Sequence, residues 1–144
     1  MQRPTIQKVV CYVTSADALL LIKHVDYPLE VTGVQVPAGT VHNGETPEEA
    51  AVRELFEETG IYGPMPVYLG EQDYDMAPTK NEIQHRHYFH FKFIGKVRER
   101  WFSQEEHDGE KDATRFECFW IPLEHGQVLS AGRGALLWQL ENHK

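Results

Sequence analysis

Three glutamates, Glu54, Glu57 and Glu58, follow helical spacing within residues 39–61. In a helix, positions three and four residues apart lie on the same side, so these carboxylates would gather together. Anions this close repel one another unless a hard divalent cation lies among them, and carboxylate oxygens suit Mg²⁺, Ca²⁺ and Mn²⁺. The spacing therefore predicts a helix that carries a metal site; the alternative is a solvated acidic face that binds nothing.

Both ends of this helix are marked in the sequence. Thr46 is a good N-cap, Pro47 suits the first helical position, and Glu49 completes a capping box with Thr46. Gly60 suits a left-handed C-terminal cap. The apolar stripe expected to pack against the protein consists of Val52, Leu55, Phe56 and Thr59. The side expected to lie roughly opposite consists of Ala50, Glu54, Glu57 and Glu58.

The same segment resembles the Nudix box of the Nudix (MutT-type) hydrolases, written G-x5-E-x7-R-E-U-x-E-E-x-G-U, where U is a bulky aliphatic residue. The matched positions are Gly39, Glu45, Arg53, Glu54, Leu55, Glu57, Glu58, Gly60 and Ile61. Nine constrained positions within 23 residues make a chance match rare. The order of strands and helices along the rest of the chain also fits that family.

The resemblance implies a hydrolase that cleaves a phosphoanhydride (pyrophosphate) bond in a nucleoside diphosphate linked to another moiety. It assigns metal binding to Glu54, Glu57 and Glu58, with the backbone carbonyl of Gly39 as a further ligand. The expected ion is Mg²⁺, with Mn²⁺ as the alternative. Arg53 joins the expected catalytic set (Glu54, Glu57, Glu58) as a supporting residue, because arginine can hold carboxylates in register.

Candidates outside the box have weaker signals. Glu117 is a candidate further metal ligand, with an ordinary strand residue as the alternative. The acids of the loop 104–112 are expected in solvent, with a contribution to the site as the alternative for Glu105, Glu106, Asp108 and Glu110. His85 and His87 have a spacing compatible with zinc ligation, although packing or substrate hydrogen bonding is the expected role. The residues available to contact a base or phosphate are Tyr74, Lys80, Arg86 and His90. Those available to stack on a base are Tyr27 and Phe89, with core packing favoured for Phe89.

Short apolar or alternating segments predict the strands of a sheet. These segments are residues 8–14, 18–24, 34–36, 66–70, 85–94 and 116–123. One face of the fifth segment carries His85, His87, Phe89, Phe91 and Phe93. Loops are expected at residues 25–34, 73–82 and 104–112. Ser130 is expected to cap a last helix. The apolar stripe of this helix would consist of Leu136, Leu137 and Leu140, and Trp138 would lie off the stripe.

Together with the resemblance, these elements predict the α/β (α+β) class, as a Nudix-type α/β/α sandwich in one domain over residues 1–144. The central sheet is expected to be mixed and mostly antiparallel. The box helix should cover one side of it and the last helix the other. The resemblance also leaves a homodimer open.

Charge and composition restrict the class of partner. The net charge is −8, and the box carries −5 of it through six acids and one base, Arg53. An acidic chain argues against broad nucleic-acid binding. No apolar stretch approaches membrane-spanning length and the N-terminus has no signal-peptide core, so a cytoplasmic location is expected. Cys11 and Cys118 lie in apolar segments and are expected to be buried, reduced thiols.

Two functional alternatives stay open at this stage. One is a non-catalytic module that binds a nucleotide or metabolite on the same fold. The other is a Nudix-fold isomerase of the isopentenyl-diphosphate type, which would use a cysteine for proton transfer. The sequence does not identify the substrate.

Overall fold

A mixed sheet of seven strands forms the centre of the computed structural model, which describes residues 3–28, 33–94, 98–105, 114–129 and 132–141. The strands are β1 (Thr5–Ser15), β2 (Ala18–His24), β3 (Ala38–Thr40), β4 (Val67–Asp75), β5 (Ile83–Phe93), β6 (Arg100–Glu105) and β7 (Thr114–Pro122). The helices are α2 (Pro47–Thr59), the 3₁₀ helix η1 (Leu123–Val128) and α3 (Trp138–Glu141).

The strand order is β4-β5-β1-β2-β7-β6, and β3 pairs with β1. Strands β1 and β5 are parallel, while the other strand pairs are antiparallel. The prediction of a mixed, mostly antiparallel sheet is therefore confirmed.

The first two strands, β1 and β2, separate after a short paired region. The chain segment that precedes α2 lies in the gap between them. The two strands pair through Thr14–Leu19 and Ser15–Ala18 only. Further along, the N–H of Cys11 donates to the carbonyl of Pro37 (2.8 Å), and the N–H of Ile22 donates to the carbonyl of Gln35 (2.7 Å). The segment that leads to β3 thus lies between β1 and β2, directly beside α2.

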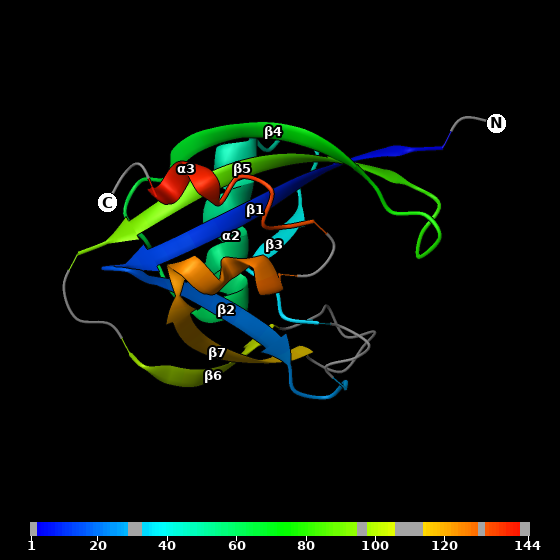
Figure 1. Cartoon of the computed structure of the whole chain (residues 1–144). Coiled ribbons are helices and arrows are strands. Elements are labelled where there is room, and N and C mark those ends of the chain that lie inside the picture. The colour runs from blue at the N-terminus through cyan, green and yellow to red at the C-terminus, as the bar shows by residue number, and fades with distance from the viewer. Residues whose placement is uncertain (1–2, 29–32, 95–97, 106–113, 130–131, 142–144) are drawn as a thin grey trace.

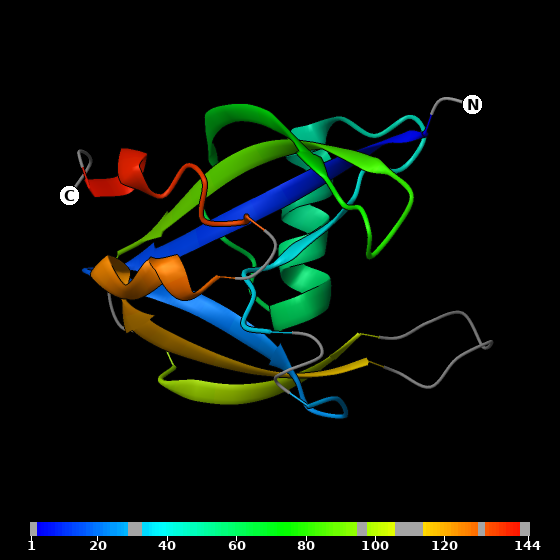
Figure 2. The same ribbon diagram turned by 45° about the vertical axis from the view of Figure 1, so that its right-hand side comes forward.

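Two core layers lie on opposite faces of the sheet, because successive strand side chains point to alternate faces. On one face, α2 packs over a cluster that includes Val9, Cys11, Leu55, Phe89 and Phe91. The other face is covered by η1 and the chain around α3, with a cluster that includes Val10, Tyr12, Leu123, Leu136 and Leu140. Figures 1 and 2 show α2 behind the sheet and both C-terminal helices in front of it. The predicted α/β/α sandwich is confirmed.

Several predicted strand limits were wrong. Residues 34–36 form only isolated bridges at Val34 and Gln35, and the strand lies at residues 38–40. The strand predicted at 66–70 continues to Asp75, because pairing with β5 extends it, so the loop predicted from Asp73 begins three residues later. The sequence analysis missed β6, which includes the first two residues of the predicted loop 104–112; residues 106–112 lie outside the described residues.

The predicted C-terminal helix is much shorter in the structure. It covers four residues, preceded by turns at 132–137, and its predicted cap Ser130 lies outside the described residues. Leu136 and Leu140 are nevertheless buried and Trp138 is exposed, as expected. Hydrogen bonds from the Tyr12 hydroxyl to the Arg133 carbonyl (2.5 Å) and from the Leu136 N–H to that hydroxyl (3.2 Å) hold the chain in these turns.

Cys11 and Cys118 are buried free thiols, as predicted. Burial raises the pKa of the Cys118 thiol to about 11 and that of Cys11 well above its usual range. Among the described residues, no helix is long and apolar enough to cross a membrane.

Candidate functional site

The ends of helix α2 form as the sequence predicts. The N–H of Glu49 donates to the Thr46 hydroxyl (3.1 Å), and the Thr46 N–H donates to the Glu49 carboxylate (2.9 Å), which completes the capping box. Gly60 adopts the left-handed conformation (φ 79°) at the other end. These two caps determine where the helix begins and ends, and therefore which way its glutamates point.

The predicted faces of α2 are only partly right. Leu55 and Thr59 are buried, as expected, but Phe56 is 42% exposed and stacks on Tyr62 with ring centroids 4.3 Å apart. Glu54 and Glu58, which were expected on the side away from the core, are buried instead. The reason is that β3 and β6 both contact α2, and the segments bond to Glu58 through the Ala38 N–H and the Ser103 hydroxyl.

Arg53 holds three carboxylates together. Its guanidinium donates to Glu45 (2.8 and 3.0 Å), to Glu54 (2.8 Å) and to Glu57 (3.1 Å), and also to the carbonyl of Thr40 (2.8 Å). The hydrogen bond from Arg53 is the main cause that lowers the pKa of Glu45 to about 2. Arg53 thus has the supporting position that the sequence predicted.

Glu54 lies against the backbone of Gly39. A Cβ on residue 39 would overlap the carboxyl group of Glu54, so only glycine leaves room for this carboxylate. Burial raises the pKa of Glu54 to about 7, and the hydrogen bond from Arg53 opposes this shift. The negative charges of Glu105 and Glu57 raise it further.

The structure brings Glu54 and Glu57 together with Glu105, which the sequence analysis expected in solvent. One carboxylate oxygen from each lies within 4.8 Å of the others; we call these three residues the carboxylate cluster. Burial is the largest cause that raises the pKa of Glu105, followed by the charge of Glu57. Carboxylate oxygens are the ligands that hard divalent cations prefer, so three of them this close together fit Mg²⁺ or Mn²⁺.

Strand β6 docks on the C-terminal end of α2 and thereby carries Glu105 to the cluster. The indole N–H of Trp101 donates to the carbonyl of Thr59 (2.8 Å), and the Ser103 hydroxyl donates to the carbonyl of Glu58. The sequence carries little signal for this strand, because Trp101 and Phe102 are adjacent aromatic residues and only the structure shows that the first is buried and the second exposed.

Glu58 and Glu117 are not members of the carboxylate cluster, although the charges of Glu54 and Glu105 act on Glu58. Glu58 is buried and accepts a hydrogen bond from the N–H of Ala38 (2.8 Å); burial raises its pKa well above the usual range. Glu117 forms ion pairs with Lys23 (3.1 Å) and Arg100 (2.6 Å). The Glu117 carboxylate is therefore paired with two basic side chains and is not part of the cluster.

Basic groups lie near the buried glutamates. Burial, followed by the charge of Lys80, lowers the pKa of Lys8, and Glu54 is close enough to oppose this shift. The Lys8 ammonium donates to the Thr40 hydroxyl (2.9 Å). Arg133 adds a further charge near both Lys8 and Glu58. The sequence analysis named Lys80 as available to a phosphate but missed Lys8, which stands at the start of an apolar segment without any motif.

The other candidates for substrate contact have structural partners. Arg86 is buried, donates to the Gln84 amide oxygen (3.0 Å), and lies over the Tyr74 ring, 4.3 Å from its centroid. His90 is buried beside the Thr14 hydroxyl (2.7 Å). Phe89 packs in the core, as favoured, and Tyr27 is exposed next to His24.

A cavity of about 510 Å³ adjoins the carboxylate cluster, between the C-terminal end of α2 and β6. Its lining includes Phe56, Glu57, Arg98, Trp101 and Glu105. Acidic, basic and aromatic side chains thus share one concave surface, as is common in sites that bind small molecules.

Comparison with known proteins identifies relatives over most of the chain. A family model described as NUDIX domain matches residues 4–136. The chain is 32% identical over 116 residues to the RNA pyrophosphohydrolase of Xylella fastidiosa (strain 9a5c), covering 72% of this chain and 60% of that protein. It is 47% identical over 51 residues to the ADP-ribose pyrophosphatase of Bacillus subtilis (strain 168), and this match covers 35% of this chain and 28% of that protein. The chain therefore spans less than two thirds of the length of both relatives.

Solved structures share the fold at low sequence identity. The MutT protein from Methanosarcina mazei Go1 has a TM-score of 0.69 at 20% identity, covering 99% of this chain and 97% of that chain. The NUDIX domain of Shewanella oneidensis NrtR, solved with ADP ribose, has a TM-score of 0.64 at 16% identity. This match covers 98% of this chain and 89% of that chain.

Proposed function

The chain belongs to the NUDIX domain family, and from this premise we propose that it is a divalent-metal-dependent hydrolase. The proposed reaction cleaves a pyrophosphate bond in a nucleoside diphosphate linked to another moiety, with water as the attacking molecule. The names of two relatives, RNA pyrophosphohydrolase and ADP-ribose pyrophosphatase, support hydrolysis of such bonds.

The observation that carries this proposal is the carboxylate cluster. Oxygens of Glu54, Glu57 and Glu105 lie within 4.8 Å of one another, and Arg53 bonds to the first two. The proposed ligand set is these three glutamates with the backbone carbonyl of Gly39, for Mg²⁺ or Mn²⁺. Glu105 thus replaces Glu117 as the proposed acid outside the box, while Glu58 is proposed to position β3 through Ala38.

The protein groups around the cluster have distinct proposed roles. A divalent cation bound there would neutralise phosphate oxygens and lower the pKa of a bound water molecule. Arg53 keeps Glu54 and Glu57 oriented, because one guanidinium donates to both. The absence of a side chain at Gly39 leaves room for Glu54. The Glu54 side chain is only 9% exposed, which limits the water around this member of the cluster and strengthens its interactions with charges.

Lys8 and Lys80, with Arg133, are proposed to bind the phosphates of the substrate. Their charges lie close enough together for Lys80 and Arg133 to lower the pKa of Lys8. Clustered cations of this kind are stabilised by an anionic ligand such as a diphosphate.

A substrate screen tests the proposed activity. A panel of nucleoside diphosphate derivatives is incubated with and without Mg²⁺, and phosphate-containing products are measured. We expect metal-dependent release of product from at least one compound. Glu57→Gln should reduce turnover by more than about 100-fold, because it removes a charge from the cluster. Glu48→Gln, on an exposed position of the same helix, is the matched control and should retain wild-type turnover.

The alternatives predict different outcomes of the same screen. A non-catalytic binding module would give saturable binding of a nucleotide without product at any metal concentration. An isomerase would give no product from the nucleotide panel and would convert an isoprenoid diphosphate, included as an additional compound, without releasing phosphate-containing fragments. Either result would overturn the proposed hydrolysis. A cytoplasmic location is proposed because the two buried thiols suit a reducing compartment, and the homodimer stays a prediction.

A further inference from the structure

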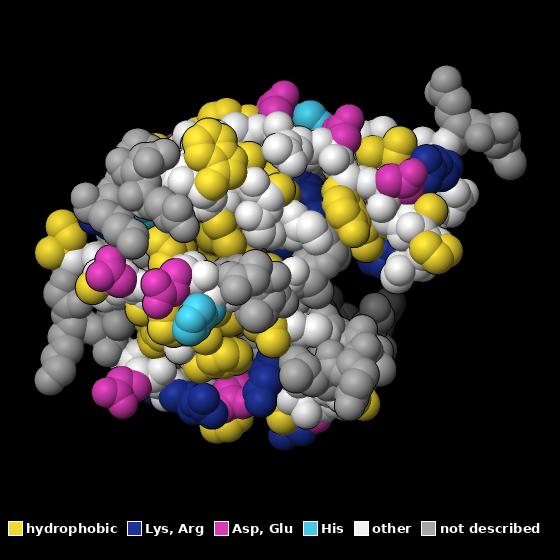
Figure 3. All heavy atoms as spheres, viewed as in Figure 1, with side chains coloured by type: hydrophobic (Ala, Val, Ile, Leu, Met, Phe, Trp, Pro, Cys, Tyr) yellow, Lys and Arg dark blue, Asp and Glu magenta, His cyan; other side chains and the backbone are white. Residues whose placement is uncertain are grey.

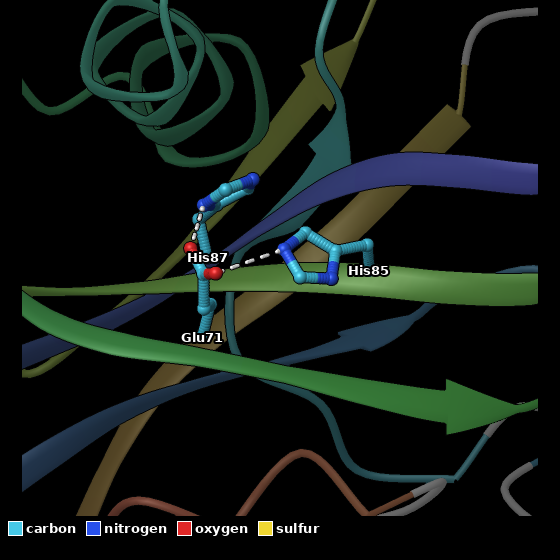
Figure 4. Close-up of side chains that lie close together, drawn as sticks. All are labelled: Glu71, His85 and His87. Atoms are coloured by element: carbon cyan, nitrogen blue, oxygen red, sulfur yellow. Dashed lines mark ion pairs between the residues drawn. The ribbon is translucent and has the colours of Figure 1, made fainter.

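A second group of potential metal ligands lies on β4 and β5. Glu71, His85 and His87 each place one ligand atom within 4.8 Å of the others. Glu71 Oε1 is 3.4 Å from His85 Nε2, and Glu71 Oε2 is 3.5 Å from His87 Nδ1 (Figure 4). The carboxylate thus faces one nitrogen of each imidazole ring.

The outer nitrogen of each ring has its own acceptor. His85 Nδ1 donates to the Asp73 carboxylate (2.5 Å), because a carboxylate can only accept. His87 Nε2 donates to the Gln7 amide oxygen (2.9 Å). In the neutral rings, these bonds place the protons on the outer nitrogens and leave lone pairs on His85 Nε2 and His87 Nδ1. Both lone pairs face Glu71.

Glu71 presents its two carboxylate oxygens to these lone pairs. The hydroxyl of Tyr68 donates to Glu71 Oε2 (2.8 Å) and also lies 3.4 Å from His87 Nδ1. Three hydrogen-bond acceptors therefore face one another across a small space. Such an arrangement becomes favourable when a cation lies between them, either a metal ion or a second proton taken up by one of the rings.

We infer that Glu71, His85 and His87 bind one Zn²⁺ ion, at a site separate from the carboxylate cluster. Two ligand atoms bound to tetrahedral zinc at about 2.0–2.1 Å lie roughly 3.3–3.4 Å apart. The two measured separations, 3.4 and 3.5 Å, are close to this value. Two imidazoles with one carboxylate form a zinc ligand set that leaves the fourth position for water.

The surrounding hydrogen bonds are those of a built metal site. A ligating histidine commonly donates its other N–H to a carboxylate or amide oxygen, which orients the ring and increases its basicity. Asp73 has this relationship to His85, and Gln7 to His87. The side chain of His87 is 12% exposed and that of His85 25% exposed, so both rings are largely held in place before a metal arrives.

The site is distinct from the carboxylate cluster but neighbours it across the sheet. Val9 of β1 pairs with His87 on one side and, on the other, with Gly39, against which the Glu54 carboxylate lies. Figure 3 shows a histidine between acidic side chains at the upper edge of the molecule, over β4 and β5. Glu71 on β4 is 14 residues before His85 and 16 residues before His87 on β5. A zinc ion here would therefore link the two paired strands and stabilise the hairpin that contains Lys80.

Zinc titration of the whole protein tests the inference. Binding is measured by calorimetry at about pH 7.5, where imidazoles are mostly neutral, with excess Mg²⁺ to occupy the carboxylate cluster. We expect one zinc ion per chain. His85→Ala and His87→Ala should each weaken binding at least about 10-fold, and Asp73→Asn about 10-fold through His85.

Matched controls separate this site from other zinc ligands. His125→Ala removes an exposed histidine elsewhere and should leave zinc affinity unchanged. Glu57→Gln removes a member of the carboxylate cluster and should also retain the zinc ion. Failure of the wild-type protein to bind zinc in excess Mg²⁺ would overturn the inference, as would undiminished binding by the His85→Ala/His87→Ala variant.

Nuclear magnetic resonance of the wild-type protein provides a test that needs no substitution. Zinc should shift the signals of His85 Nε2 and His87 Nδ1, the two nitrogens that face Glu71, and leave those of His125 unchanged. Zinc-induced shifts confined to other histidines would contradict the inference even if the alanine variants fail to fold. Cobalt substitution should give the visible absorption of a tetrahedral site.

Discussion

The carboxyl group of Glu54 occupies the space that a side chain on Gly39 would fill. Gly39→Ala should therefore rotate Glu54 away from Glu57 and Glu105. Because the carboxyl group is the end of a flexible side chain, the free energy of unfolding should fall by only about 1 kcal/mol. Mg²⁺ affinity and turnover should fall at least about 10-fold, as measured by metal titration of the hydrolytic rate.

Gly44→Ala is the control for this substitution. Residue 44 has a positive φ of 81° and no atom within 4 Å of an added Cβ. Alanine there should cost about 1–2 kcal/mol through backbone strain and leave the metal affinity unchanged. Equal metal affinities in the two variants would contradict the role assigned to Gly39.

Arg53→Lys keeps the charge but removes the planar set of donors that reaches Glu45, Glu54 and Glu57. We expect a loss of about 1–3 kcal/mol in the free energy of unfolding, measured in urea, and a 10–100-fold loss of turnover. Arg115→Lys changes an exposed ion pair with Asp26 and should alter stability by at most about 1 kcal/mol. Similar losses from both variants would mean that Arg53 is an ordinary surface cation.

Glu105→Gln tests the acid that β6 brings to the cluster. Removing its charge relieves repulsion from Glu57, so metal-free stability should stay the same or rise. The Mg²⁺ concentration for half-maximal activity should increase at least about 10-fold. Glu124→Gln, on an exposed residue of η1, should change neither quantity. An unchanged Mg²⁺ requirement in Glu105→Gln would remove Glu105 from the ligand set.

The raised pKa of Glu54, about 7 against an ordinary 4.5, predicts a pH dependence of metal-free stability. Between these values the folded protein retains a proton that the unfolded chain has released, so the free energy of unfolding falls as pH rises. The contribution of Glu54 is on the order of 3 kcal/mol across this window. Glu54→Gln should remove it, which urea unfolding at several pH values measures in both proteins.

Saturating Mg²⁺ should oppose this loss of stability, because the cation binds the ionised carboxylate in the folded state only. Stability curves of the wild-type and Glu54→Gln proteins that run parallel from about pH 4.5 to 7 without metal would contradict the prediction.

Lys8→Met tests the proposed phosphate contact. The substitution preserves much of the apolar stem but removes the charge near Lys80 and Arg133. We expect the KM for a nucleoside diphosphate substrate to rise about 10-fold or more, with a smaller change in kcat. Lys92→Met, on an exposed position of β5, is the control and should keep the wild-type KM. An unchanged KM in Lys8→Met would exclude this contact.

Local patterns predicted helix α2 closely, because its determinants lie within one short segment. Thr46, Glu49 and Gly60 act through the backbone of their own neighbours, so their effect can be read from spacing. The association of Arg53 with Glu57 likewise follows from residues four positions apart on one helix. The strand at 18–24 was also predicted with its observed limits.

The sequence could not show which distant residues complete each site. Glu105 joins Glu54 only because β6 docks on the end of α2, through contacts between residues more than 40 positions apart. Gln7 reaches His87 because β1 and β5 are parallel neighbours. Local spacing acts over a few residues and determined the helix and its charges by itself. The burial that raises the pKa of Glu54, and the pairing of strands that orients His85 and His87, depend on how remote segments pack, which only the tertiary structure decides.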